Sequence, residues 1–134
     1  MAKQTIEIGD AELEVLKALW DLGPGSVREV MERLHERGRK VAYTTVLTFL
    51  TRLESKGCVA SDKSELAYIY KAKVSRDRVS AWRVREVVEQ LYDGAAGQLV
   101  LQLMQTEKFS AQELEQLQQL IDRLDSRKGS DEPG

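Results

Sequence analysis

Hydrophobic residues recur at helical spacing in three consecutive segments of the first half of the chain, and glycine breaks separate these segments. The first segment predicts a helix over residues 10–22, with Asp10 as its N-cap. The second predicts a helix between Ser26 and Gly38, because Ser26 followed three residues later by a glutamate is a capping box. The third helix is predicted over residues 42–56. The apolar positions of the three helices are Leu13, Leu16, Leu19 and Trp20, then Val27, Val30, Met31 and Leu34, then Ala42, Val46, Phe49, Leu50 and Leu53.

The third predicted helix carries hydroxyl residues where a merely solvated face would favour Glu, Lys and Gln. Thr44, Thr48 and Thr51 stand opposite its apolar stripe, with Thr45 and Arg52 beside them. Because hydroxyl side chains are poor helix formers, helix propensity does not explain their concentration here. Short hydroxyls flanked by basic residues suit a helix that lies close against a groove of nucleic acid. A solvated face that happens to be rich in threonine is the open alternative.

Two short strands are predicted after this helix, over residues 58–63 and 68–73, with residues 63–65 at the tip of the hairpin. Three helices followed by a β-hairpin form the winged variant of the helix-turn-helix. The predicted fold class is therefore mainly α. In this architecture the third helix enters the major groove of DNA, and the hairpin reaches an adjacent groove or phosphate.

The second half of the chain predicts three more helices, over residues 75–92, residues 95–106 and from Ser110 onward, where Ser110 and Glu113 form another capping box. The last helix has apolar residues at heptad spacing. Helices this short cannot bury such stripes alone, and a second copy of the chain is the simplest partner. A compact helical cap folded onto the winged domain is the alternative. The residues assigned to dimerisation are Leu99, Leu103, Leu114, Leu117, Ile121 and Leu124.

These patterns divide the chain into a winged-helix DNA-binding domain over residues 1–74, a helical dimerisation region over 75–126 and a disordered tail over 127–134. The net charge of −2 conceals a matching asymmetry. Residues 1–25 carry a net charge of −3, residues 26–85 carry +7, and residues 86–134 carry −6. A basic module joined to an acidic segment is typical of a nucleic-acid binder with a separate interaction region.

Eight residues of the basic module are the expected DNA contacts. Thr44, Thr45 and Thr48 are expected to approach base edges, whereas Arg52 and Lys63 are expected to hold phosphates. Backbone contacts of the DNA are expected at the entry of the third helix, where Arg39, Lys40 and Tyr43 stand. The competing hypothesis is a winged-helix protein–protein interaction module that does not bind DNA, which the net acidity of the chain permits.

The block Ala42-Tyr43-Thr44-Thr45-Val46, followed by Thr48 and by Arg52-Leu53, resembles the BlaI/MecI penicillinase-repressor family. Residues 13–23 and 26–30 carry the same resemblance, which extends over residues 8–125. It implies a homodimeric bacterial transcriptional repressor that binds an inverted-repeat operator in double-stranded DNA. It also implies, for many members, release when a membrane-bound sensor metalloprotease is activated and the repressor is cleaved. The family's cleaved Asn-Phe pair corresponds here to Gln102-Leu103, the candidate cleavage site.

No residue pattern for catalysis, a cofactor or a metal site accompanies these features, and the protein is not expected to be an enzyme. His35 is the single histidine and is expected on the surface, while Cys58 is expected to pack as a small apolar side chain. One cysteine excludes internal disulfides, and neither a signal peptide nor a membrane-spanning run is present. Together these points predict a cytoplasmic protein.

Overall fold

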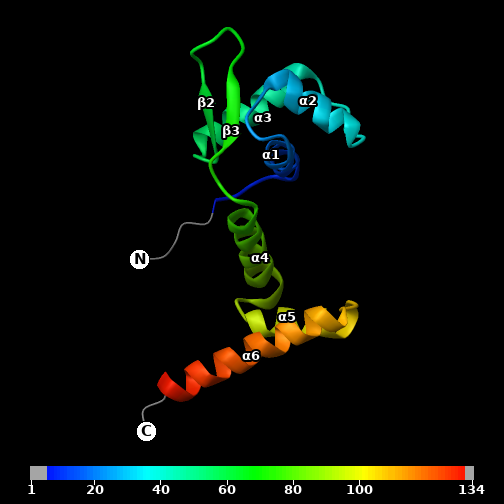
Figure 1. The fold of residues 1–134 in the computed structure, drawn as a ribbon, viewed down its shortest axis with the longest axis vertical. Helices are drawn as coiled ribbons and strands as arrows, with labels where there is room; N and C mark the ends of the chain where they lie inside the picture. The colour runs from blue at the N-terminus through cyan, green and yellow to red at the C-terminus, as the bar shows by residue number, and fades with distance from the viewer. Residues whose placement is uncertain (1–5, 132–134) are drawn as a thin grey trace. The chain divides into compact units, whose positions relative to one another are not determined.

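The computed structural model describes residues 6–131 and forms two compact units, the first ending at Leu91 and the second beginning at Tyr92. Figure 1 shows the elements along the chain, which is mainly helical with one small sheet, as the sequence predicted. In chain order they are α1 (Asp10–Leu22), β1 (Gly25–Ser26), α2 (Val27–Glu36), α3 (Tyr43–Ser55), β2 (Val59–Asp62), β3 (Ile69–Ala72), α4 (Arg76–Tyr92), α5 (Ala96–Thr106) and α6 (Ala111–Asp131).

The core of the first unit lies among α1, α2 and α3, and the apolar stripes predicted for these helices supply most of it. Leu16, Leu50 and Leu53 are fully buried. Two further positions of α1, Val15 and Ala18, are buried although the predicted stripe omitted them. In contrast, Ala42 is exposed, because it is the N-cap of α3 and precedes the first turn that faces the core.

A three-stranded antiparallel sheet in the order β1-β3-β2 lies beside the helices. The two long strands were predicted with slightly wider bounds, and their register pairs Val59 with Ala72 and Asp62 with Ile69. Strand β1 was not predicted, because only Gly25 and Ser26 form it, and they pair with Tyr70 and Ile69. The hairpin of β2 and β3 extends beyond the sheet to a long exposed tip (Figure 1).

Local capping signals set several helix starts as predicted. At α2, the Ser26 backbone N–H donates to Glu29 Oε1 at 2.9 Å, and the Glu29 N–H donates to Ser26 Oγ at 3.2 Å. Ser110 and Glu113 make the same two bonds at the start of α6. The prediction for α1 was wrong: its N-cap is Gly9, and Asp10 is the first helical residue.

The first unit reaches farther along the chain than the predicted DNA-binding domain, which ended at residue 74, because α4 packs on the winged core. Val79 is buried in that core, and Trp20 Nε1 donates to the Val74 carbonyl at 2.9 Å. Arg83 Nη1 of α4 donates to the Ile8 carbonyl at 2.9 Å. The start of α4 is thus fixed to α1 by side chains that a segment-by-segment analysis of the sequence does not connect.

The second unit contains α5 and α6, whose predicted starts are confirmed within one residue. Its end differs from the prediction, because α6 continues to Asp131 through part of the segment expected to be disordered. Arg127, close to this end, is a good helix former. Residues 132–134 of the predicted tail lie outside the described residues. Within the described part of the chain, no helix is both long and apolar enough to cross a membrane.

Candidate nucleic-acid interface

Helix α3 separates its residues into a buried face and an exposed face, as the sequence predicted. Val46, Leu50 and Leu53 are buried in the core and fix the rotation of the helix. The exposed face carries the four threonines and Arg52. An exposed helix face of short side chains allows the helix backbone to approach another surface closely, which is what entry into a major groove requires. The residues of this face are Thr44, Thr45, Thr48, Thr51 and Arg52.

Two of the threonine hydroxyls are bonded to the helix itself. Thr48 Oγ1 donates to the Thr44 carbonyl at 2.9 Å, and Thr51 Oγ1 donates to the Leu47 carbonyl at 2.8 Å. Such bonds satisfy the hydroxyl donors on the helix surface, at a slight cost to the stability of the helix. These bonds also fix the direction in which each of the two hydroxyl groups points in the free protein.

The turn between α2 and α3 is held by side-chain and backbone hydrogen bonds. His35 Nε2 lies 2.9 Å from the Val41 carbonyl, so the ring spans the turn and donates to it. The Arg39 N–H donates to the Leu34 carbonyl at 2.8 Å, and Gly38 takes a positive φ of 84° that a glycine adopts without strain. His35 is exposed, as predicted, but the sequence did not reveal that it positions the entry of α3.

The hairpin tip contributes a cation and an exposed apolar residue. Lys63 Nζ lies 5.5 Å from the centroid of the Tyr68 ring. This cation–π contact joins the residue that follows β2 to the residue that precedes β3. Leu66, between them, is completely exposed. The predicted phosphate contact Lys63 therefore stands at the outer end of the hairpin, at a distance from the core.

A cleft of about 480 Å³ lies between α3 and the hairpin. Its walls combine apolar side chains, tyrosines and one arginine, a mixture that suits the sugars and phosphates of a nucleic-acid strand. Of the predicted contacts, Tyr43 lines this cleft. The sequence analysis missed Arg28 and Tyr68, although Arg28 lies in the first turn of α2, two residues after the cap Ser26, and could have been placed at the surface. The lining residues are Ser26, Val27, Arg28, Tyr43, Leu47, Leu66, Ala67, Tyr68 and Tyr70.

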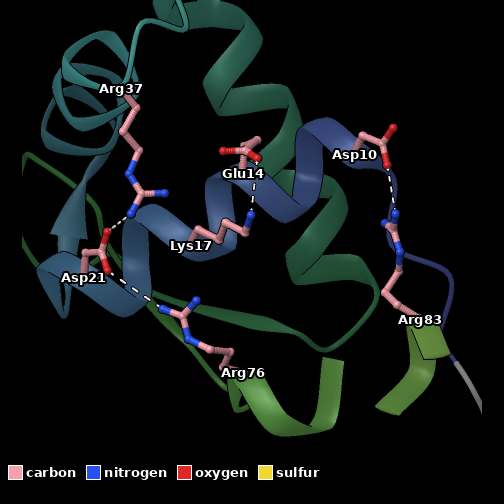
Figure 2. Close-up of polar contacts among 7 residues, drawn as sticks. All are labelled: Asp10, Glu14, Lys17, Asp21, Arg37, Arg76 and Arg83. Carbon is pink, nitrogen blue, oxygen red and sulfur yellow. Dashed lines mark hydrogen bonds and ion pairs between the residues drawn. The ribbon is translucent and has the colours of Figure 1, made fainter. Parts of the chain in front are cut away.

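The basic residues of the first unit fall into two electrostatic classes. Figure 2 shows the first class, in which Arg37 and Arg76 share Asp21, and Arg83 pairs with Asp10 at 3.0 Å. The second class has no ion-pair partner among the described residues, and it contains all four cations predicted to contact DNA. Unpaired cations keep their full attraction for an external polyanion. The second class includes Arg28, Arg39, Lys40, Arg52 and Lys63.

Arg52 continues the exposed threonine face one turn beyond Thr48, toward the C-terminal end of α3. Its guanidinium is 5.9 Å from the centroid of the Phe49 ring. Its charge also acts on the buried carboxylate of Glu12 in α1. The structure thus places Thr44, Thr45, Thr48 and Arg52 on one exposed helix face. Arg39, Lys40 and Tyr43 lie at the entry of that helix, and Lys63 lies at the hairpin tip.

The second unit exposes the apolar face that the sequence assigned to dimerisation. No side chain of α5 is buried within a single chain. Leu103 is 43% exposed, Ile121 is 53% exposed and Leu124 is 53% exposed. Leu114 is also exposed, while Leu99 and Leu117 are half-buried. The candidate cleavage pair Gln102-Leu103 lies in the second half of α5, and both residues are exposed.

The described residues contain no group of three or more His, Cys, Asp and Glu side chains that could hold a metal ion. Cys58 is fully buried, and burial raises the pKa of its thiol. A buried thiol with a raised pKa forms little thiolate at neutral pH and is a poor nucleophile. This environment agrees with the packing role expected for Cys58.

The family model and the sequence relatives give one family. The family model described as penicillinase repressor matches residues 8–123. The transcriptional regulator BlaI of Mycobacterium tuberculosis is 34% identical over 134 residues, which cover 99% of this chain and 95% of that protein. The penicillinase repressor of Staphylococcus aureus is 26% identical over 127 residues, covering 95% of this chain and 100% of that protein. The solution structure of the DNA-binding domain of the repressor BlaI is 28% identical, covers 57% of this chain and 93% of its own, and has a TM-score of 0.49.

Proposed function

The chain belongs to the penicillinase repressor family, and from that premise we propose that it is a DNA-binding transcriptional repressor that acts as a homodimer on an inverted-repeat operator. The observation that carries the proposal is the combination of an exposed threonine face on α3 with cations that have no acidic partner among the described residues. A winged-helix module for protein partners would have no need of cations kept unpaired around a face of short hydroxyls.

On DNA, α3 lies in the major groove with Thr44, Thr45 and Thr48 toward the base edges. Arg39 and Lys40, at the entry of α3, lie against the phosphates that border the groove. Lys63, at the hairpin tip, also lies against phosphates, because the hairpin reaches the adjacent groove of the duplex. These cations supply affinity for any sequence, and the threonines supply the preference among sequences.

The homodimer forms through α5 and α6. Leu103, Leu114, Ile121 and Leu124 are exposed in one chain, and the apolar residues of α6 follow heptad spacing, so a second copy of the same face covers them. A two-fold symmetric dimer carries two winged units related by the same symmetry, and its natural target is an inverted repeat. Each half-site contact is weak alone, and the second winged unit binds at the high effective concentration set by the dimer.

Release follows from the same arrangement. A cut between Gln102 and Leu103 separates both the winged unit and part of α5 from the heptad face of α6. Each winged unit then binds one half-site without its partner. We therefore propose that a sensor protease inactivates the repressor in α5, and that its inducer need not be a β-lactam, since the family's Asn-Phe pair is replaced here. Mass spectrometry of fragments made by a genomically adjacent sensor protease tests this. Cleavage outside residues 95–106, or derepression with the chain intact, would overturn it.

The DNA-binding proposal is tested by a fluorescence-anisotropy titration of the full chain against the promoter fragment that flanks its own gene. The matched control is a duplex of the same length and composition with its sequence scrambled. We expect tight binding to the promoter and weaker, strongly salt-dependent binding to the control duplex. Equal binding to both duplexes, or none to either, would instead favour the protein–protein module.

A further inference from the structure

A second pocket of the first unit, of about 310 Å³, lies where α4 meets α1. It shares no lining residue with the cleft between α3 and the hairpin. Its apolar lining consists of Val79, which is buried, and of Leu13 and Trp20, which are half-buried. The indole N–H of Trp20 donates to the Val74 carbonyl at 2.9 Å, so the ring is held in place and offers the pocket its apolar surface.

Three cations complete the lining, and none of the described residues that line the pocket is acidic. Lys17 comes from α1, and Arg76 and Arg83 come from α4 (Figure 2). The nearest carboxylates lie outside the pocket lining, where Lys17 is 3.6 Å from Glu14 and Arg76 is 3.8 Å from Asp21. Because both separations exceed that of a hydrogen bond, these two cations keep N–H donors for a ligand.

Arg76 is positioned to exchange its carboxylate partner for a ligand. Its guanidinium lies 4.9 Å from the centroid of the Trp20 ring, at the border of the apolar lining. Asp21 has a closer partner in Arg37, so that carboxylate stays paired when Arg76 turns toward the pocket. Arg83 is fixed by two hydrogen bonds to the segment that leads into α1 and supplies a stationary positive charge.

We propose that this pocket binds a small organic carboxylate with an apolar body. Its carboxylate lies between Lys17 and Arg76, where charge-assisted hydrogen bonds form, and its body covers Trp20 and Val79. The proposal concerns a site separate from α3 and does not depend on DNA binding.

The size and the mixed lining of the pocket favour this occupant over larger or simpler anions. A volume of about 310 Å³ is at the lower end of the range for small-molecule sites. A protein partner would cover roughly 800 Å² of each surface, far more than this pocket offers. A phosphate of DNA would satisfy the cations but has no apolar body to cover Leu13 and Val79.

The test follows the indole N–H signal of Trp20 by nuclear magnetic resonance in the full-length protein. The chain has two tryptophans, and Trp82→Phe identifies which signal belongs to Trp20. The probe is hydrocinnamate, an aromatic ring on a short chain that ends in a carboxylate. We expect a saturable shift at about millimolar concentration, the affinity usual for so small a ligand. Its neutral amide should bind about tenfold more weakly, because it lacks the charge that the cations attract.

Two variants at exposed positions of α4 test the two parts of the site. Arg76→Gln removes one cation and should weaken hydrocinnamate binding about tenfold, as expected for a lost hydrogen bond between charged groups. Ser80→Phe fills the pocket without changing its charge and should abolish the saturable shift. Arg85→Gln is the matched control, since Arg85 is an exposed cation of α4 that pairs with Glu89 and does not line the pocket. It should bind hydrocinnamate as the wild type does.

Three results would overturn the proposal. The first is no saturable shift of the Trp20 signal, or equal affinity for hydrocinnamate and its amide. The second is an equal effect of Arg76→Gln and Arg85→Gln on binding. The third is a shift of the same size with inorganic phosphate, which would assign the pocket to phosphate contacts instead. Thermal unfolding of each variant confirms that a loss of binding does not reflect a loss of folding, and DNA binding by α3 is measured separately.

Discussion

Lys56, the residue after α3, donates to the buried carboxylate of Glu12 in the first turn of α1, with Nζ 2.8 Å from Oε1. The same ammonium group donates to the Glu7 carbonyl at 2.6 Å, and the Gly9 N–H donates to Glu12 Oε1 at 2.8 Å. The C-terminal end of α3 is thereby tied to the start of α1. The Glu12 side chain is only 8% exposed, so this ion pair is largely withdrawn from water.

We expect Lys56→Met to lower the free energy of unfolding by about 2 kcal/mol, because it leaves a buried carboxylate without its cation. The double variant Lys56→Met with Glu12→Gln should be more stable than Lys56→Met alone, since it removes the uncompensated charge. Lys17→Met is the control, because Lys17 pairs with Glu14 at 3.6 Å on the surface and should matter by about 0.5 kcal/mol or less. Urea denaturation measures all three, and equal effects of Lys56→Met and Lys17→Met would contradict this account.

The stability of the first unit should depend on pH through the same carboxylate. Burial alone would raise the pKa of Glu12, but the bonds from Lys56 and Gly9 and the charge of Arg52 together hold that pKa below its ordinary value. A carboxyl whose pKa is lower in the folded state stabilises the fold above its unfolded pKa, which is about 4.3. This stabilisation is lost as the pH falls through the lower folded pKa.

Thermal unfolding between pH 3 and pH 6, scanned in roughly half-unit steps, checks this expectation. The melting temperature of the wild-type protein should fall more steeply in acid than that of Glu12→Gln, which has no group to titrate at this position. Parallel curves for the two proteins would show that Glu12 has the same pKa in the folded and unfolded states.

The sequence predicted what depends on local signals and missed what depends on contacts between distant segments. Capping boxes such as Ser26 with Glu29 are complete within four residues, and their helix starts were confirmed. The burial of Glu12 could not be predicted, because its partner Lys56 is 44 positions away. Helical periodicity alone makes Glu12 an ordinary acidic residue of a first helical turn.

The same distinction applies to the candidate interface. The threonine face of α3 follows from helical periodicity, and the structure confirms that it is exposed. The contact of His35 with Val41 and the cleft beside Arg28 and Tyr68 depend on how the turn and hairpin fold back on α3. Periodicity within one segment carries no information about them.

A phosphate contact and a base contact should leave different signatures in DNA binding. We expect Lys63→Ala to weaken binding to promoter and scrambled duplexes by the same factor, and to reduce the slope of log K against log salt by about 1. Lys108→Ala, at an exposed lysine between α5 and α6, is the matched control and should leave the slope unchanged. Anisotropy titrations across a salt series provide the slopes. A loss confined to the promoter duplex would assign Lys63 to base recognition instead.

The dimer face is tested by placing charges in it. We expect Leu117→Asp with Ile121→Asp to convert the dimer into monomers, because burying the new carboxylates would cost several kcal/mol. Gln112→Asp with Gln119→Asp is the matched control, since it adds two charges to the opposite face of α6 and should remain dimeric. Sedimentation velocity at micromolar concentration distinguishes the two outcomes, and near-ultraviolet circular dichroism reports whether the winged unit stays folded. A monomeric wild-type protein would contradict the assignment.

The central claim is that two copies of α3, related by two-fold symmetry, bind DNA in successive major grooves. Hydroxyl-radical footprinting of the full-length protein on its promoter fragment tests it most directly. We predict two protected half-sites with dyad symmetry, their centres separated by one or more whole helical turns of about 10.5 base pairs. A single protected patch without symmetry, or uniform cleavage along the fragment at saturating protein, would contradict the account.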